Sequence, residues 1–449
     1  MKMSALTQYI DLYREYRGQI CDHAPALLNG RREAAYERLL REHLPQKGDE
    51  SYTALSPEEM FAPDYGVNIN RVRFPVDMAS TFRCGVPNIS TLLALVVNDT
   101  FVPTSNLLRN LPEGITVDSL ARVAAENPDL VERYLGKALP GQGNAAADLN
   151  TLLLQDGVFI HIPAGMSLDR PVQIVNVFNA VAPVMGVRRI VVAVGDNASA
   201  SVLVCDHSVQ PDVAYLSNQV VEIYLGAGAS LEYYDMEESS AATSRLCQLY
   251  ATQADDSRLL VNGTTLLGGR TRNDYHCHLA GRGCSANLAG MVVATDSQIV
   301  DTYTDVIHSH PDGASEQMFK YVLDRSSVGA FYGRIDVEEP ALHTRAYQSN
   351  RNLLASADAR MYTRPQLEIY CDEVKCSHGA TVGQLDAAAL FYMRQRGIPE
   401  AEARMMLMQA FMADVIDTVS IPALRTRLQQ LVERRLAGHS ALCADCGIN

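Results

Sequence analysis

A short turn pattern recurs along the middle of this chain and constrains its fold more than any other feature. Each copy has the end of an apolar run, a tight turn with Gly or Asn, a small residue, a serine and a return to an apolar run. The four copies are Ile162–Leu168, Val194–Ala200, Leu225–Leu231 and Ala280–Ala286, and their serines are Ser167, Ser199, Ser230 and Ser285. The first three copies begin about 31 residues apart, and the fourth lies nearly two such periods further on. Gly and Asn tolerate the positive φ that such turns need.

A fixed period of this length indicates that one structural unit stacks on the next. Between the turns lie short β-branched and apolar runs, such as Val158–Ile162 and Met318–Leu323, and no long helical pattern interrupts them. We therefore expect a mainly β fold, a β-helix (β-solenoid) whose coils share one core and whose four serines lie at equivalent corners. A β-sandwich with similar turns is the alternative.

Local residue composition and hydrophobic periodicity divide the chain into four parts. Residues 1–150 are expected to be mostly helical, residues 151–381 to form the central β-helix, residues 382–437 to form a C-terminal helical domain, and residues 438–449 to form a tail. In the first part, Arg31–Leu44 is rich in good helix formers. Ser119–Leu135 has helical periodicity that Pro128 should split into two shorter helices.

The C-terminal domain should contain three helices. Asp386 is placed to cap a helix that runs to Gly397, and Pro399 suits the start of a second helix. That second helix is rich in methionine from Met405 to Ile416, which is typical of an adaptable core face or a docking surface. Ser420 is expected to cap the third helix.

Charge and hydropathy exclude several classes of function. The formal net charge is −14 with no basic stripe, so we expect neither nucleic-acid nor membrane binding. No apolar run approaches the roughly 20 residues of a membrane span, and Met1–Tyr13 lacks the apolar core of a secretory signal. We therefore expect a cytoplasmic protein whose ten cysteines stay reduced. The sequence also lacks a P-loop, a dinucleotide fingerprint, a nucleophile elbow and a zinc-protease helix, so any ATP would be hydrolysed by another chain.

Cys376 and His378 are the strongest candidates for metal chemistry. They are two positions apart, so on a strand both side chains lie on one face. A thiolate and an imidazole form half of a site for a soft metal such as iron, zinc or copper(I). A buried thiol beside a hydrogen-bonded histidine is the simpler alternative.

Two further groups have the residue types of metal ligands. His276 and His278 should share one strand face while Cys277 takes the other, and His308 and His310 repeat the spacing; we expect these to be structural residues of the solenoid. Cys443 and Cys446 have ligand or redox spacing but lie on the tail. An unstructured tail and a labile metal contact are equally consistent with that pair.

Several longer segments resemble the SufB/SufD family of iron–sulfur cluster assembly proteins, and its SufD branch in particular. They are Pro365–Asp386 with the following Leu390–Ile398, then His310–Lys320, Tyr347–Leu353 and Phe61–Gly66. The resemblance implies a right-handed parallel β-helix between helical N- and C-terminal domains, and a scaffold subunit that is not an enzyme. It also implies pairing with the homologous SufB and binding of a SufC ATPase through the C-terminal helices.

The resemblance further implies an iron–sulfur cluster held transiently at the interface with SufB. The motif histidine, here His378, is implicated in cluster formation, and the motif cysteine is Cys376. SufB-type chains carry a key cysteine where this chain has Leu354–Asp358 without one, which favours SufD. Whether flavin binds the assembly, and whether the isolated chain forms a homodimer, are left open.

Two other functions remain as alternatives. A homodimeric β-helix protein without metal chemistry would share the same fold. A polysaccharide lyase or hydrolase would need carboxylates in a groove, for which Asp301, Asp305 and Asp324 are candidates. The absence of tryptophan, which often stacks on sugar rings, argues against the second.

Overall fold

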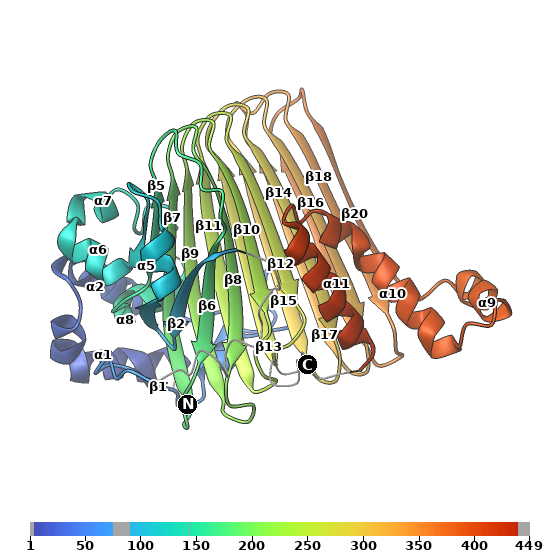
Figure 1. Ribbon diagram of the computed structural model, residues 1–449, viewed down its shortest axis with the longest axis horizontal. Helices are drawn as coiled ribbons and strands as arrows, with labels where there is room; N and C mark the ends of the chain where they lie inside the picture. The colour runs from blue at the N-terminus through green and yellow to red at the C-terminus, as the bar shows by residue number, and fades with distance from the viewer. Residues whose placement is uncertain (1–3, 75–89, 142, 439–449) are drawn as a thin grey trace.

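The protein is described from a computed structural model, which covers residues 4–74, 90–141 and 143–438. Its centre is a parallel β-solenoid with helices packed at both ends of the chain (Figure 1). The fold class predicted from the recurring turn is confirmed.

Two ten-stranded sheets form the walls of the solenoid. Sheet A contains β1 (Gly66–Val67), β4 (Thr116–Ser119), β5 (Val158–Ile162), β7 (Val184–Val194), β9 (Tyr215–Leu225), β11 (Thr243–Gln253), β13 (Arg270–Leu279), β15 (Ile299–His308), β17 (Val328–Val337) and β19 (Arg360–Ile369). Sheet B contains β2 (Leu92–Val97), β3 (Thr100–Pro103), β6 (Val172–Phe178), β8 (Ser199–Ser208), β10 (Ser230–Glu237), β12 (Arg258–Thr265), β14 (Ser285–Ala294), β16 (Ala314–Leu323), β18 (Arg345–Leu354) and β20 (Lys375–Gly383).

From β5 onward successive strands alternate between the two sheets, so each coil contributes one strand to each wall. From β5 onward every strand pairs in parallel with the strand two places along the chain, as β10 does with β8 and β12. This alternation distinguishes the fold from the β-sandwich alternative, whose sheets are built from antiparallel neighbours. At the N-terminal end, β4 and β3 pair antiparallel with β5 and β2.

The four serines occupy one column of the solenoid, as the sequence predicted. Ser199 lies in register with Ser167 and with Ser230. Ser230 lies in register with Arg258, which in turn pairs with Ser285. The intervening coil therefore exists but carries arginine in place of serine, which is why the turn pattern skipped it.

The turn glycines and asparagine have the backbone conformation for which they were selected. Gly165, Asn197, Gly228 and Gly283 all have positive φ, from 54° to 74°. The coil that the pattern missed uses Asp256 at the same corner, with φ of 54°. Aspartate tolerates this region because its short side chain can hydrogen-bond locally.

The lumen, the space enclosed between sheets A and B, holds the main hydrophobic core. Inward-facing residues of both sheets fill it, including Ile190, Val221, Leu249, Val261 and Tyr321. Because side chains alternate along a strand, the outward-facing residues of each sheet are free to pack against helices.

The helices of the N-terminal part cover the outer face of sheet A near its first coils (Figure 1). They are α1 (Ala5–Asp22), α2 (Ala26–Leu39), α3 (Pro57–Phe61), α6 (Leu120–Glu126), α7 (Pro128–Glu132) and α8 (Ala145–Leu153), whereas α5 (Ser105–Asn110) packs against β2 of sheet B with Leu107 in the lumen core. Pro128 does separate two short helices, as predicted. The helix expected over Arg31–Leu44 is displaced toward the N-terminus, and strands β2 to β4 from this part of the chain extend both sheets.

The C-terminal helices lie on the opposite wall. They are α9 (Ala387–Gln395), α10 (Glu400–Asp417) and α11 (Pro422–Leu436). Met412, Val415 and Leu428 pack against Met291 and Leu203 on the outer face of sheet B. Among the described helices, none is long and apolar enough to cross a membrane.

Asp386 caps α9 as predicted, since its carboxylate accepts from the amides of Ala388 and Ala389. The capping role expected for Ser420 is wrong. Helix α11 begins after Ile421 without a side-chain cap, and the hydroxyl of Ser420 instead donates to Glu232 of β10 at 2.6 Å. Ser420 is therefore used to attach the helices to the solenoid.

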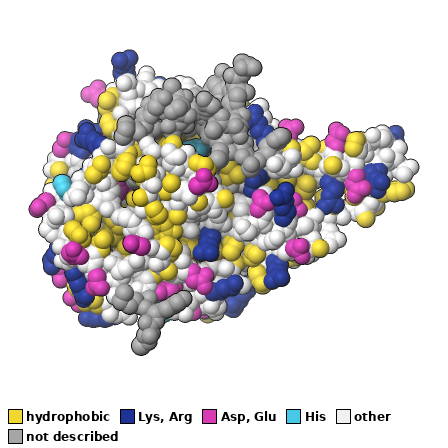
Figure 2. Space-filling view, turned by 90° about the horizontal axis from the view of Figure 1, so that it is seen from below, with side chains coloured by type: hydrophobic (Ala, Val, Ile, Leu, Met, Phe, Trp, Pro, Cys, Tyr) yellow, Lys and Arg dark blue, Asp and Glu magenta, His cyan; other side chains and the backbone are white. Residues whose placement is uncertain are grey.

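Helix α9 projects from the body of the molecule (Figure 1), and the same projection is the narrow extension at the right of Figure 2. None of its residues is buried, and Phe391 and Tyr392 are both exposed by 60% or more. Large apolar side chains in an uncovered helix are typical of a surface that binds another protein.

Candidate functional site

The candidate residues Cys376 and His378 lie on β20, the last strand of sheet B. In the described part of the chain β20 pairs with β18 alone, and β19 is the last strand of sheet A. The C-terminal end of the solenoid is therefore open, with one edge of each sheet unpaired (Figure 1).

Cys376 and His378 share one face of β20, as their spacing predicted. In the parallel register Cys376 lies beside Ala346 and His378 lies beside Gln348, both of which are buried in β18. These neighbours face the lumen, so the two candidate ligands face the lumen side at the coil that ends it. No further coil covers them.

Cys376 is half-buried and packs against a small apolar cluster at this end, which includes Ile335, Ala346 and Cys371. Burial raises the pKa of the Cys376 thiol, and the nearby Cys371 acts in the same direction. A thiol that is protonated and packed is a poor ligand until it loses its proton.

His378 is exposed, and among the described residues its imidazole has no hydrogen-bond partner. It is therefore available from solvent. No group of three or more histidine, cysteine, aspartate or glutamate side chains in the described residues is arranged to hold a metal ion. The pair on β20 can supply two ligands at most, and one without deprotonation of Cys376.

The second histidine group is accounted for by local packing. His276 and His278 face outward from sheet A, and Cys277 faces the lumen, where burial raises its pKa to about 12. The ring of His276 stacks on Tyr250 with 4.7 Å between centroids and 9° between planes. His278 lies 2.8 Å from the hydroxyl of Ser309.

His308 and His310 have different environments despite the repeated spacing. His308 is fully buried in the lumen, with Nε2 2.9 Å from the hydroxyl of Ser315. Burial lowers the pKa of His308 to about 4. His310 is exposed at the adjacent corner. The two therefore do not form a ligand pair.

Two of the three carboxylates suggested for a glycosidase form ion pairs with arginine. Asp301 is buried 2.7 Å from Arg272, and Asp305 lies 2.9 Å from Arg334. Asp324 lies beyond the end of β16, at a corner. Asp301 and Asp305 both lie on the outer face of β15 in ion pairs with arginine, which does not suit the acid and nucleophile of sugar cleavage.

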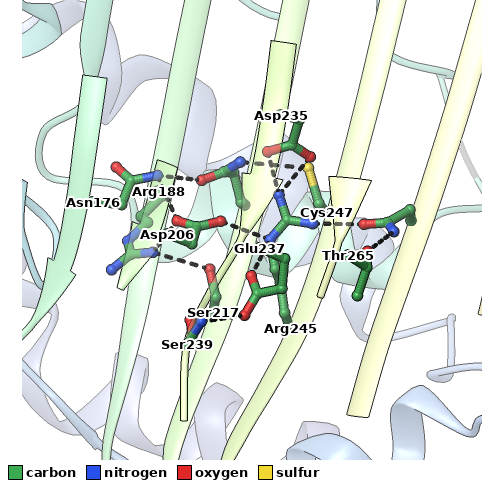
Figure 3. Close-up of polar contacts among 12 residues, drawn as sticks. Asn176, Arg188, Asp206, Ser217, Asp235, Glu237, Ser239, Arg245, Cys247 and Thr265 are labelled. Carbon is green, nitrogen blue, oxygen red and sulfur yellow. Dashed lines mark hydrogen bonds and ion pairs between the residues drawn. The ribbon is translucent and has the colours of Figure 1, made fainter. Parts of the chain in front are cut away.

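A buried polar network that was not predicted from the sequence lies inside the lumen (Figure 3). Arg245 lies 2.7 Å from both Asp206 and Asp235, and 3.1 Å from Glu237. Arg188 pairs with the other oxygen of Asp206 at 3.0 Å. All five side chains are at most 4% exposed.

The charges of this network nearly balance. Burial opposes ionisation of Asp206, but the guanidinium groups of Arg245 and Arg188 outweigh it and lower the pKa of Asp206. Burial raises the pKa of Glu237, and Arg245 opposes that shift without cancelling it. Along their strands, these charged residues occupy the alternate positions that face the lumen. This alternation is the sequence signal for the network, but it can be interpreted only once the strand register is known.

The tail cysteines Cys443 and Cys446 lie outside the described residues. The remaining architecture defines a class: a β-solenoid with helices attached to both outer faces and a soft-ligand pair at an open terminal coil.

Comparison with known proteins places this class in a family. The SUF system FeS cluster assembly, SufBD core domain matches residues 177–411, and the SufBD protein N-terminal region matches residues 3–174. The chain belongs to the SufBD family of iron–sulfur cluster assembly proteins, as its resemblance indicated.

The similarity to individual relatives is moderate. The iron-sulfur cluster assembly SufBD family protein slr0076 of Synechocystis is 29% identical over 420 residues, which is 91% of each chain. The iron-sulfur cluster assembly protein SufD of Escherichia coli is 28% identical over 227 residues, covering 51% of this chain and 54% of that protein. The SufD protein of Bacillus subtilis is 26% identical over 326 residues, covering 72% and 74%.

Proposed function

We propose that this chain is the SufD-type subunit of a cluster-assembly complex, pairing with a SufB-type homologue and binding a SufC-type ATPase. The observation that carries the proposal is the open terminal coil, where the exposed His378 lies beside an unpaired strand edge. A site with two potential ligands gains the rest from a partner whose own strand approaches that edge.

Apolar exposure at the same end supports pairing with a partner. Among the described residues, six large apolar side chains are exposed on the last two coils, namely Leu342, Tyr347, Tyr362, Ile369, Tyr370 and Val382. Exposed apolar groups gathered at an unpaired edge favour association over solvation. A second copy of this chain could occupy the edge as well, which keeps the homodimeric β-helix protein as the second candidate.

The iron–sulfur cluster is the cargo of this proposed site. His378 would donate one imidazole nitrogen to iron, and Cys376 would contribute less because its thiol is packed and its pKa raised. Iron binding requires the neutral imidazole, so loading should weaken in acid. No residue of this chain is assigned to flavin.

The ATPase is proposed to dock on α9 and the adjoining start of α10. The apolar stripe of α11 is already covered, since Leu424, Leu428 and Val432 pack in the cluster on sheet B. In contrast, Phe391 and Tyr392 of α9 are exposed. We therefore narrow the docking surface expected for the C-terminal helices as a whole to α9 and the start of α10.

We further propose a cytoplasmic location and a non-catalytic role for the chain itself. All the cysteines that the structure describes are free thiols, which suits a reducing compartment. The sequence has no P-loop, so ATP hydrolysis falls to the ATPase partner.

The test is anaerobic co-expression with SufB-type and SufC-type partners, followed by complex mass and iron and sulfide analysis. We expect a complex of all three chains, with normal assembly but lowered iron and sulfide in the His378→Ala variant. Cys376→Ala should lower the yield less. Normal loading of the His378→Ala complex at limiting iron would remove the ligand role, and recovery of this chain only as a homodimer would favour the second candidate.

A further inference from the structure

Gln348 is a buried amide directly beside His378 in the register of sheet B. It is 4% exposed, and its Oε1 atom has no hydrogen-bond partner among the described residues. Burying an acceptor without a donor costs free energy. The unpaired Oε1 atom of Gln348, next to an exposed imidazole, therefore needs a structural explanation.

A short chain of hydrogen bonds fixes which way the Gln348 amide points. The hydroxyl of Thr304 lies 2.6 Å from Oε1 of Gln317. That distance suits an O–H donor and is short for an N–H donor, so the nearer atom of Gln317 is its oxygen. Nε2 of Gln348 donates to the same oxygen at 3.2 Å. The Gln348 amide must therefore present its nitrogen to Gln317, which leaves Oε1 as the unsatisfied end.

The facing sheet leaves room for this amide. Gly333 of β17 lies opposite, and a Cβ atom there would come within 2.2 Å of Nε2 and 2.9 Å of Oε1 of Gln348. Any other residue at position 333 would push the amide away. In the coil that precedes His378, the solenoid thus has glycine in sheet A facing the long amide side chain of Gln348 in sheet B.

A histidine that binds metal through one ring nitrogen usually donates the N–H of the other to a nearby acceptor. That second hydrogen bond selects the tautomer and holds the ring orientation. Among the described residues, neither ring nitrogen of His378 has a hydrogen-bond partner, and Oε1 of Gln348 is a free acceptor on the paired strand. Neighbouring strands of a sheet lie about 4.8 Å apart, which brings the two side chains into the same neighbourhood.

We propose that Gln348 is a positioning residue that accepts the N–H of one His378 ring nitrogen and leaves the other nitrogen free to bind iron. This inference rests on the proposed ligand role of His378. It assigns the direction of the hydrogen bond: Thr304 and Gln348 donate to Gln317, and His378 donates to Gln348.

The test uses nuclear magnetic resonance of the metal-free chain labelled with ¹⁵N-histidine, at a pH well above the ordinary pKa of histidine. The signal of His378 is assigned by its loss in His378→Ala. We expect one dominant tautomer at His378 in the wild type, whereas His310, which is exposed, reports the mixture found in water. Gln348→Met should bring His378 to that mixture, and Gln348→Glu, which keeps an acceptor, should preserve the single tautomer.

Two further variants separate positioning from general loss of stability. Gly333→Ala should displace the amide and act like Gln348→Met without changing residue 348. Asn352→Leu removes another buried amide from the same strand, opposite Val382, and should leave the His378 tautomer unchanged. In the assembled complex, Gln348→Met should weaken iron binding about tenfold to a hundredfold.

A wild-type His378 with the same tautomer mixture as His310, or an unchanged spectrum in Gln348→Met, would overturn the inference. These readouts are independent of cluster formation. A single tautomer that depends on Gln348 together with normal loading of His378→Ala would instead refute the ligand role and leave the hydrogen bond standing.

Discussion

Lys320 of sheet B donates a hydrogen bond to the carboxylate of Asp414 in α10, with 2.5 Å between Nζ and Oδ2. The same ammonium group donates to the backbone oxygen of Phe411 at 2.8 Å and lies 5.0 Å from the centre of its ring. The lysine side chain is 4% exposed, whereas that of Asp414 is 60% exposed. One buried cation on the outer face of the solenoid therefore holds the C-terminal helices in place.

Replacing Lys320 by methionine should loosen this attachment while keeping the apolar stem of the side chain. We expect a loss of about 1–3 kcal/mol in the free energy of docking the helices, because the partners in α10 lose a charged donor. Hydrogen exchange should rise in the amides of α10 and α11 and not in the strands from β6 to β12. Lys375→Met, at an exposed position on β20, is the control. Unchanged exchange in α10 would show that the helices are held without the ammonium group of Lys320.

Replacing Phe391 and Tyr392 together by serine should prevent capture of the ATPase. Both side chains are exposed on α9 and contribute nothing to the core, so the variant should keep the thermal stability of the wild type. Co-purification of the tagged chain with the ATPase measures the effect, and we expect at least a tenfold drop in captured partner. Val181→Ser is the matched control, because it removes apolar surface from a corner residue that is 93% exposed and lies away from α9. Full capture by the double variant would move the docking surface to another part of the molecule.

His308 should make the fold sensitive to acid. The unfolded chain takes up a proton at this imidazole below about pH 6.5, whereas burial delays uptake in the folded chain to about pH 4. Protonation therefore favours the unfolded state, and stability is lost as pH falls from about 6.5 toward 4. At pH 5 the loss is about 2 kcal/mol.

The His308→Gln variant should lack this particular loss. Denaturant titrations at neutral pH and at pH 5 should show a smaller drop for the variant than for the wild type. His310→Gln, two residues further on and exposed, should keep the pH profile of the wild type. Parallel pH profiles for the wild type and His308→Gln would contradict the assignment.

Glycine substitutions should have opposite signs at two positions. Gly228 has φ of 66°, and a Cβ atom would lie 2.5 Å from Oδ1 of Asn197 in the preceding coil. Gly228→Ala should therefore cost about 1–2 kcal/mol of unfolding free energy. Gly30 lies exposed in α2 with open space around its Cα, so Gly30→Ala should gain about 0.5–1 kcal/mol. Denaturation midpoints measure both, and a stabilised Gly228→Ala variant would argue against the strained corner.

The solenoid was predictable because its corners are local structures. A positive φ at Gly165, Asn197, Gly228 or Gly283 depends on the residue itself, so a turn pattern in the sequence reports it directly. The cap of α9 by Asp386 and the break at Pro128 are local for the same reason. One coil has Asp256 at its corner and Arg258 in place of the serine, so it departs from the pattern at two positions and was missed.

The candidate site was only half predictable. The spacing of Cys376 and His378 gave their common face, because alternation is a property of any strand. Nothing local indicated Gln348, which lies thirty positions earlier and meets His378 only through the pairing of β18 with β20. The use of Ser420 as an attachment to Glu232, and not as a cap, likewise depends on a strand far away in the sequence.

The sequence by itself determined where the solenoid turns its corners, which side chains share a face of a strand, and the family to which this protein belongs. Tertiary structure alone decided which inward positions face one another, and so placed Arg245 against Asp206 and His378 beside Gln348. The physical reason is the variable length of the coils: Asp256 and Gly283 are 27 positions apart, whereas Gly165 and Asn197 are 32 apart. Register between coils is therefore set by hydrogen bonding and packing across the stack, and cannot be counted along the chain.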